Sequence, residues 1–447
     1  MDRRKTRVLL SPGNLVIQQM NQALFSFIAA SPTAFHAAAN AARQLEAAGY
    51  HALRESESWQ LVPGEGYFVT RNLSSLIAFR VPEGPFSGFM LAAAHGDSPA
   101  FKIKENALLE DRHYVRFSTE KYGGMLCASW MDRPLSVAGR VLIRTDSGIE
   151  TRLVDLQDVT AIIPNVAIHF NRSANDGMAY NAAVDMLPLY GLAGAGTDFR
   201  KRLAEAASAS EDVLLTTDLI VYNPQCGVEW GDFISAPRLD DLQCAFAALT
   251  AFLGSGTRES LPVYCLFDNE EVGSQTKQGA ASTFLSDVLT RICHSLGFSD
   301  DAQRQKLASS LLLSCDNAHG VHPNHPEYKD PNHESYPNGG IVIKYNANQR
   351  YTSDAVSAAL FQLICERADV PYQRYANRAD MPGGSTLGNI ANTQVSLNTV
   401  DIGLAQFAMH SAYETAGAKD TEYMVRALKA FFERSLQMER DGTYRIV

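Results

Sequence analysis

Apolar stretches of strand length alternate with helical patterns along most of this chain, and this alternation limits the folds open to it. The strand-length stretches are residues 89–94, 261–267, 311–314 and 341–343. Apolar side chains recur at helical spacing in residues 242–252 and 356–367. Strands that alternate with helices are typical of a sheet with mostly parallel strands and helices on its faces. The sequence therefore predicts an α/β fold with a mixed, largely parallel sheet flanked by helices.

A β-rich segment interrupts this alternation. Its apolar pieces are shorter, as in residues 140–144 and 159–163, and Gly, Asp and Asn turns separate them. We interpret residues 98–235 as an inserted β-rich domain, which divides the catalytic domain into residues 1–97 and 236–447. A chain of 447 residues can build such cores without a structural metal, so any metal here is expected to be catalytic.

The charge and the cysteine content of the chain limit the classes of binding partner and the cellular compartment that we expect for it. The chain has 39 basic and 49 acidic side chains, a formal charge of −10, and no long like-charged run, which argues against nucleic acid or membrane as a partner. Its seven cysteines are scattered and contain no Cys-x-x-Cys pair, as expected for reduced thiols. The apolar run at residues 8–10 is broken by Ser11 and Pro12 before it reaches signal-peptide length. We expect a cytoplasmic protein that acts on small soluble ligands.

Candidate metal ligands recur where the predicted strands end. Ligands of open α/β sheets bind beyond the carboxyl ends of the strands, so these positions are expected to converge. Each position taken alone is more simply an ordinary polar turn. His410 follows the apolar residues 407–409, and we expect it to open the C-terminal helix. The full set of strand-end candidates is His95, Asp97, Glu270, Glu271, Asp316 and His410.

Asp240 lies just before the helical pattern of residues 242–252, where it could be either a helix N-cap or a metal ligand. The whole set favours the ligand, because two histidines and several carboxylates at one sheet edge suit zinc or manganese in a two-metal hydrolase. Neighbouring side chains point in different directions, so one of Glu270 and Glu271 can bind metal while the other faces the substrate water.

A second group of histidines lies in a segment rich in Pro and Asn, together with Asp330 and Glu334. We predict a surface loop here, and only His319, the histidine nearest to Asp316, is a candidate for substrate binding. The sequence has no Gly-x-Ser-x-Gly elbow, Gly-x-Gly-x-x-Gly turn or P-loop, which argues against serine hydrolase and nucleotide-binding functions. The histidines of this segment are His319, His322, His325 and His333.

Several short blocks of the chain resemble those of the aspartyl aminopeptidases, in the same order and nearly from end to end. They include Ala-His-Gly-Asp-Ser-Pro at 94–99, Pro-Arg-Leu-Asp at 237–240, Asp-Asn-Glu-Glu-Val-Gly-Ser at 268–274 and Ala-Met-His-Ser at 408–411. Further blocks are residues 25–28, 31–36, 67–72 and 348–351. The resemblance is specific, because these blocks contain nearly every candidate ligand. Asp241 departs from it, since asparagine is common at that position.

The resemblance implies a metal-dependent aminopeptidase with two Zn²⁺ per subunit, which Mn²⁺ or Co²⁺ could replace. By this resemblance Asp240 bridges the two metals. His95 and Asp316 complete one site, and Glu271 and His410 complete the other.

The resemblance also implies roles around the metals. Glu270 matches the general base, Asp97 a supporting residue, and Lys344 a basic pocket residue that would pair with an acidic first side chain, with Tyr351 close by. His169 lies in residues 166–171, which match a segment whose histidine reaches the active site of a neighbouring subunit. The inserted domain, residues 98–235, resembles the family's oligomerisation domain, and a tetrahedral homododecamer is thus implied.

The expected reaction is hydrolysis of the first peptide bond of peptides with a free N-terminus, with a preference for N-terminal Asp or Glu. One alternative is a binuclear zinc aminopeptidase that prefers neutral or hydrophobic residues. Another is a metal-dependent deacylase or carboxypeptidase of similar architecture, since a fold does not fix the chemistry. A third is a self-assembling shell protein with a vestigial metal site.

Overall fold

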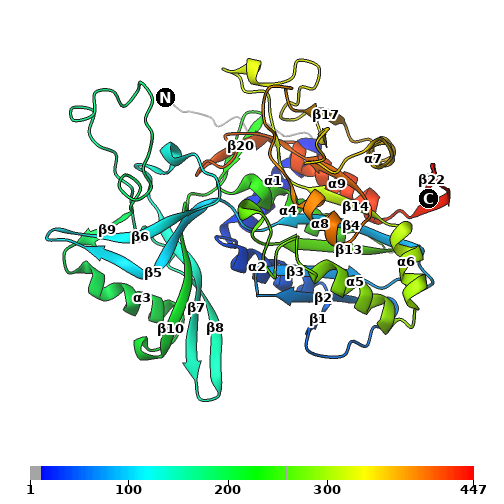
Figure 1. The fold of residues 1–447 in the computed structure, drawn as a ribbon, viewed down its shortest axis with the longest axis horizontal. Coiled ribbons are helices and arrows are strands. Elements are labelled where there is room, and N and C mark those ends of the chain that lie inside the picture. Colours follow the sequence, from blue (N-terminus) through cyan, green and yellow to red (C-terminus); the bar gives the residue numbers. More distant parts are fainter. Residues whose placement is uncertain (1–11, 257–258) are drawn as a thin grey trace, which may run out of the picture.

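The computed structural model describes residues 12–256 and 259–447, so the apolar run at residues 8–10 lies outside the described residues. No helix in the two described ranges is both long and apolar enough to cross a membrane. Figure 1 shows a larger part, in which helices flank a broad sheet, beside a smaller part built mainly of strands.

The larger part is organised around a nine-stranded mixed sheet. Five of its eight strand pairs are parallel, namely β1–β2, β4–β13, β4–β14, β14–β18 and β16–β17. The predicted α/β fold with a largely parallel sheet is therefore confirmed. In spatial order the strands are β1 (His51–Leu53), β2 (Gly66–Arg71), β3 (Ser75–Arg80), β13 (Ser260–Phe267), β4 (Gly88–His95), β14 (Leu311–Cys315), β18 (Asn398–Gly403), β16 (Ile341–Tyr345) and β17 (Tyr372–Ala376).

Helices cover both faces of this sheet, which explains why its central strands are apolar without interruption. Along β4, Met90, Ala92 and Ala94 enter one core, whereas Phe89 and Leu91 enter the other. Five of the seven cysteines are buried in these two cores as free thiols. The first core contains α1 (Pro12–Ala29), α2 (Ala34–Ala47), α4 (Leu239–Leu253), α7 (Ala355–Arg367) and α9 (Asp420–Phe432). The second contains α5 (Phe284–Ser295) and α8 (Leu387–Gln394), and Leu307 of α6 (Asp300–Ala308) packs against it.

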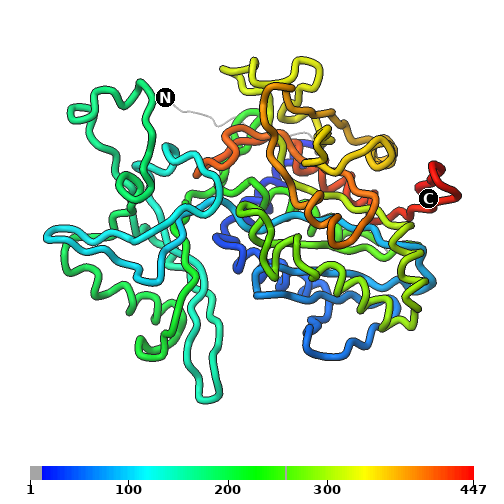
Figure 2. Tube along the Cα trace, in the orientation of Figure 1, coloured from blue at the N-terminus to red at the C-terminus, as the bar shows by residue number. Residues whose placement is uncertain are grey.

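The smaller part is a six-stranded antiparallel sheet with a core of its own, formed by side chains such as Phe101, Phe117 and Leu219. α3 (Phe199–Ala206) packs onto this core through Phe199 and Leu203. Figure 2 shows a long excursion, residues 164–188, that stands out from the sheet. The strands in spatial order are β8 (Gly148–Asp155), β7 (Ser136–Thr145), β10 (Leu214–Tyr222), β5 (Ala100–Glu110), β6 (Tyr114–Tyr122) and β9 (Leu189–Leu192).

The apolar residues 159–163 of the β-rich segment form no regular strand. Ala161, Ile162 and Ile163 make only isolated bridges, to Leu135, Leu189 and Met131. The bridge to Met131 is parallel, whereas those to Leu135 and Leu189 are antiparallel, so no continuous ladder forms.

A small five-stranded sheet joins the two parts. His410 lies in this sheet region, so the expectation that it begins the C-terminal helix is wrong. That residue lies in the turn between β19 (Ala405–Phe407) and β20 (Glu414–Gly417), and the last long helix, α9, begins only at Asp420. The chain cannot continue as a helix after His410, because β20 pairs with β12 (Phe233–Ala236). β11 (Val228–Trp230) and β15 (Ala318–His319) lie at the two edges of this sheet, and the chain ends in the hairpin of β21 (Leu436–Arg440) and β22 (Thr443–Ile446).

Candidate metal centre

Three neighbouring strands, β13, β4 and β14, end at one edge of the large sheet, where four of the candidate residues lie. His95 is the last residue of β4 and lies opposite Phe267, the last residue of β13. Glu270 and Glu271 follow in the short 3₁₀ helix η4 (Glu270–Val272), and Asp316 directly follows β14. Parallel strands end at the same edge, so residues far apart in the sequence meet there.

The side chains form two groups that share Asp240. In the first group, His95 Nε2 lies 3.6 Å from Asp240 Oδ1 and 3.9 Å from Asp316 Oδ1. In the second, His410 Nε2 lies 3.4 Å from Asp240 Oδ2 and 3.3 Å from Glu271 Oε2. The ligand atoms of each group lie within 4.8 Å of one another, close enough to hold one ion per group.

The chemistry of this donor set fits zinc. Imidazole nitrogens and carboxylate oxygens are ligands that zinc accepts. Asp240 Oδ1 and Glu271 Oε1 are buried and accept no hydrogen bond from any described residue. Burial, helped by the Asp240 carboxylate, also raises the pKa of Glu271 well above its usual value. A bound cation would offset the cost of burying these charges together.

The alternative that Asp240 caps a helix is wrong. The backbone of α4 is non-helical at Asp240 and Asp241, and the Asp240 carboxylate does not cap the helix that follows. Its Oδ1 accepts no hydrogen bond from any described residue, and its Oδ2 lies 3.4 Å from His410 Nε2. The Asp240 side chain is 3% exposed and faces the two histidines. Its backbone N–H donates a 3.0 Å hydrogen bond to Glu414 Oε2.

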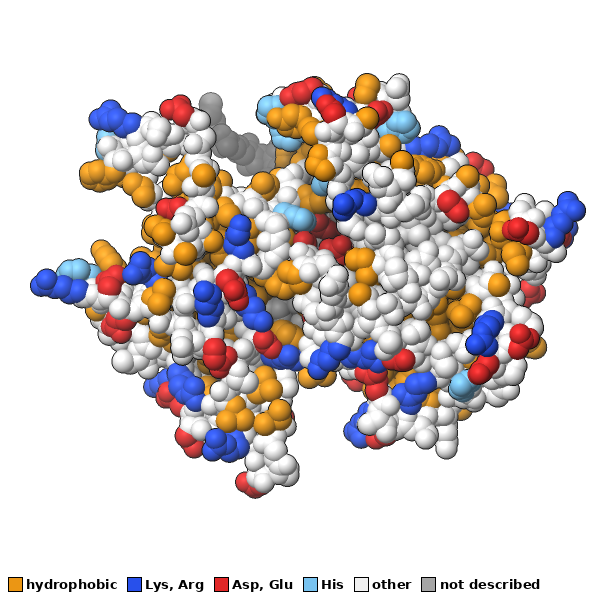
Figure 3. All heavy atoms as spheres, in the orientation of Figure 1, with side chains coloured by type: hydrophobic (Ala, Val, Ile, Leu, Met, Phe, Trp, Pro, Cys, Tyr) orange, Lys and Arg blue, Asp and Glu red, His pale blue; other side chains and the backbone are white. Residues whose placement is uncertain are grey.

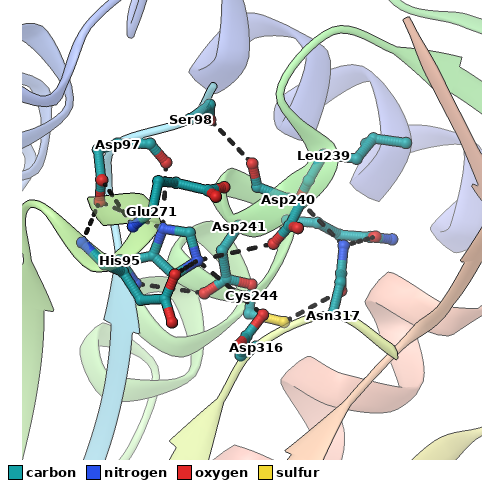
Figure 4. Close-up of polar contacts among 12 residues, drawn as sticks. His95, Asp97, Ser98, Leu239, Asp240, Asp241, Cys244, Glu271, Asp316 and Asn317 are labelled. Carbon is teal, nitrogen blue, oxygen red and sulfur yellow. Dashed lines mark hydrogen bonds and ion pairs between the residues drawn. The ribbon is translucent and has the colours of Figure 1, made fainter. Parts of the chain in front are cut away.

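Asp97 supports the site from behind, as Figure 4 shows. Its Oδ1 lies 3.3 Å from His95 Nδ1, the ring nitrogen opposite to the one that faces Asp240. The same carboxylate accepts hydrogen bonds from the backbone N–H groups of Glu270 and Glu271, each at 3.2 Å. Asp97 therefore fixes both the histidine ring and the turn that carries the two glutamates.

The structure adds two carboxylates that the sequence did not single out as site residues. Asp241 accepts a hydrogen bond from the backbone of His95 at 3.2 Å. Glu414 accepts from the backbones of Asp240 and His410, at 3.0 Å and 2.8 Å, and burial raises its pKa to about 8. In the sequence, Asp241 differs from the family pattern but was not predicted to be a site residue. No sequence pattern indicates a role for Glu414.

A pocket of about 130 Å³ opens beside the cluster, and Glu270, Lys344, Tyr351 and His319 line it. Lys344 is 2% exposed, so it is a buried lysine and not a solvated one. Its Nζ donates to the backbone oxygen of Asn317 at 3.1 Å and lies 3.9 Å from Asp316 Oδ2. Burial lowers the pKa of Lys344, but nearby acidic groups, Asp316 foremost, outweigh it and raise that pKa overall. Figure 3 shows acidic side chains at the floor of a recess in the middle of this face.

A larger cavity of about 300 Å³ lies on the other side of Asp97 and Asp240, between the large sheet and the six-stranded sheet. Among the described residues that line this larger cavity, Glu270, Glu271 and His410 are absent. The smaller pocket, which contains all three, is therefore the better candidate for substrate.

The remaining candidates lie apart from the cluster. His322, His325 and His333 belong to a surface segment, and none of them is in a metal-holding group of the described residues. His169 is exposed in the excursion of residues 164–188, and among the described residues of its own chain it belongs to none of the groups that could hold a metal.

Comparisons with known proteins agree with this chemistry. A sequence model of the family described as aminopeptidase I zinc metalloprotease (M18) matches residues 27–432. The probable M18 family aminopeptidase 2 of Pseudomonas paraeruginosa is 43% identical over 428 residues, which cover 93% of this chain and 99% of that protein. A chain in the complex of Ape4 and Nbr1 has a TM-score of 0.90 and 34% identity, with 93% of this chain and 86% of that chain covered. The mApe1 dodecamer of S. cerevisiae has a TM-score of 0.81 and 27% identity, with coverage of 93% and 96%.

The family match extends over most of the chain, and the relative is similar over nearly its whole length. The predicted resemblance to zinc aminopeptidases is confirmed at this level. This chain therefore belongs to the M18 family, the aminopeptidase I zinc metalloproteases, and is a zinc-dependent aminopeptidase.

Proposed function

We propose that this enzyme uses two metal ions to remove N-terminal Asp or Glu from peptides. One observation carries the acidic preference: the buried lysine Lys344 lines the same pocket as Glu270 and the shared carboxylate Asp240. A buried positive charge at that place favours a negatively charged side chain in the pocket.

In this proposal Asp240 would be a ligand shared by two zinc ions. His95 and Asp316 would hold one ion, and Glu271 and His410 would hold the other. The two groups of ligand atoms and the shared Asp240 support this assignment. When bound, the zinc ions would lower the pKa of a shared water and polarise the carbonyl of the scissile bond.

Glu270 is the proposed general base. Its side chain is 13% exposed, lines the pocket, and has Oε2 4.0 Å from His95 Nε2. The carboxylate accepts a proton from the attacking water and passes it to the nitrogen of the departing amine, so Glu270 ends the cycle as it began. Burial, more than any neighbour, raises the pKa of Glu270 to about 8.

Cleavage at the first peptide bond follows from the charge of the pocket. A free α-amino group is positively charged at neutral pH, and the carboxylates of Glu270, Asp316 and Asp240 crowd the pocket. A peptide N-terminus is attracted there, whereas an N-acetylated peptide offers no such charge. This argument favours an exopeptidase over the alternative of a deacylase.

We also propose that the enzyme assembles into a homododecamer through residues 98–235, with His169 reaching a neighbouring active site. Two observations support this. Val166, Ile168 and Phe170 beside His169 expose large apolar side chains, Phe170 to 87%, as interface residues do. A related structure is the mApe1 dodecamer.

Profiling of the N-terminal residue on a peptide library, with zinc, manganese and cobalt supplied separately, tests the proposed function. We expect release of single N-terminal residues, fastest from Asp and Glu, and little cleavage of N-acetylated controls. A preference for Leu or Ala would leave the aminopeptidase but remove the acidic specificity. Preferential cleavage of the acetylated peptides would contradict the proposed exopeptidase chemistry.

A further inference from the structure

Tyr122, the last residue of β6, makes a contact that joins the six-stranded sheet to the metal centre. Its phenol O–H donates a 2.6 Å hydrogen bond to Asp97 Oδ2. Asn269 Nδ2 in turn donates to the phenol oxygen at 2.8 Å. Asp97 follows β4 and Asn269 follows β13, so one hydroxyl bridges two segments of the large sheet.

The carboxylate that receives this hydrogen bond is the most connected group behind the metal ligands. Asp97 contacts the His95 ring and accepts the backbone N–H groups of Glu270 and Glu271. The contact with Tyr122 is the shortest on that carboxylate. Without it, the Asp97 carboxylate could rotate, and the turn that carries Glu270 and Glu271 would lose its fixed hydrogen-bond acceptor. The His95 ring would keep only its 3.1 Å contact with the backbone oxygen of Asp97.

The chain continues from Tyr122 along the other side of the cluster, and we call residues 122–126 the β6 strap. Gly123 has φ +74°, and a Cβ on it would lie 3.1 Å from Glu271 Cβ, so the strap runs directly against that residue. The backbone N–H of Leu126 donates to the carbonyl of His410 at 3.1 Å. The strap therefore touches Glu271 and His410, two residues of the second ligand group.

We propose that Tyr122 is a positioning residue, through which the six-stranded sheet sets the geometry of the metal centre. This inference rests on the proposed roles of His95, Glu270 and Glu271. Partners that orient metal ligands typically change metal affinity or activity by about 10- to 100-fold when removed. Tyr122 acts one step farther out, through Asp97, and does not touch substrate.

Tyr122→Phe tests the inference, because it removes only the hydroxyl. Tyr222→Phe is a matched control, since Tyr222 lies on β10 of the same sheet and donates a 2.7 Å hydrogen bond to Asp155 instead. For both variants and wild type we would measure kcat, KM, zinc retention against a competing chelator, the visible spectrum of the cobalt-loaded protein, and thermal unfolding.

We expect Tyr122→Phe to lower kcat or zinc affinity by about tenfold or more, with KM nearly unchanged, an altered cobalt spectrum and unfolding like that of Tyr222→Phe. If Tyr122→Phe matches Tyr222→Phe in spectrum, zinc retention and kcat while wild type binds two metals, the inference fails and the proposed function stands. If wild type binds no metal, the proposed function itself fails.

Discussion

At the scale of single residues, two adjacent glutamates occupy different environments. The Glu271 side chain is 3% exposed, and its Oε2 lies 3.3 Å from the His410 ring. The Glu270 side chain is 13% exposed and lies at the edge of the cluster, in the substrate pocket. The same side-chain chemistry at neighbouring positions is thus suited to two tasks, metal binding and proton transfer.

Glu270→Gln is expected to lower kcat by about a hundredfold to ten-thousandfold, the usual contribution of a positioned general base. Metal content should stay near that of wild type, because the substitution removes proton transfer and no proposed ligand. Elemental analysis and steady-state kinetics check both points. Glu271→Gln is the matched comparison and should lose metal. Activity of Glu270→Gln within a few-fold of wild type would refute the assignment.

Lys344→Met is expected to reduce kcat/KM for N-terminal Asp and Glu far more than for Leu or Ala. Removing one partner of a buried charge pair costs about 2 to 5 kcal/mol, and a neutral substrate never forms the pair. The Asp-to-Leu ratio of kcat/KM is the measurement.

Lys344 also lies near Asp316, so metal content must be measured in the same variant. Lys329→Met is a suitable control, because Lys329 donates to the backbone of His319 beside the pocket but does not line it. Equal losses for Asp and Leu substrates in Lys344→Met would remove Lys344 as the specificity determinant.

The candidate ligands at strand ends could be predicted from the sequence, whereas the residues that hold these ligands in position could not. His95, Glu270 and Asp316 follow long apolar strands, and the end of a strand is visible in a hydropathy pattern. Glu414 reaches the site through the pairing of β20 with β12, and Tyr122 through the packing of a separate sheet. Both contacts depend on tertiary structure, so no local pattern marks either residue.

At the scale of elements, the long strands β4, β13 and β14 and the helices α4 and α7 agree with the sequence within a few residues. The short strands β15, β19 and β20 were missed. Each has two to four residues, too few to show a period. Their pairing with segments far along the chain is what makes them strands.

The capping box that begins α7 offers a test of stability at this scale. Asp354 Oδ1 accepts the backbone N–H of Ser357 at 2.8 Å, and Ser357 Oγ accepts that of Asp354 at 3.1 Å. Asp354→Ala is expected to lower the free energy of unfolding by about 1 kcal/mol, measurable by urea denaturation. Glu366→Ala removes an exposed carboxylate from the last turn of the same helix and should change stability by less than about 0.5 kcal/mol. Equal effects of the two substitutions would contradict the capping argument.

At the scale of the whole molecule, the fold class could be predicted but the strand order could not. Alternating strands and helices indicate a mostly parallel sheet. The place of β13 between β3 and β4 depends on contacts between distant segments, and hydropathy carries no information about it.

The assembly proposal predicts a particle far heavier than a monomer in light scattering. His169→Ala should lower kcat in that particle without loss of bound zinc, as expected for an imidazole supplied by a neighbouring chain. His113→Ala, an exposed histidine on the same part of the molecule, is the control and should be fully active. A stable monomer with full activity would overturn the proposal.

The place of β13 in the large sheet also determines the order of events while the ribosome makes this protein. β4 is complete at His95, but its neighbours β13 and β14 begin only at Ser260 and Leu311. At about 5 to 20 residues per second, β4 waits roughly 10 to 30 s for β13. The six-stranded sheet, whose strands lie between Ala100 and Tyr222, emerges whole during that interval. The nascent chain meanwhile carries an apolar strand with both edges unpaired, so this is the stage of synthesis at which it most needs protection from aggregation.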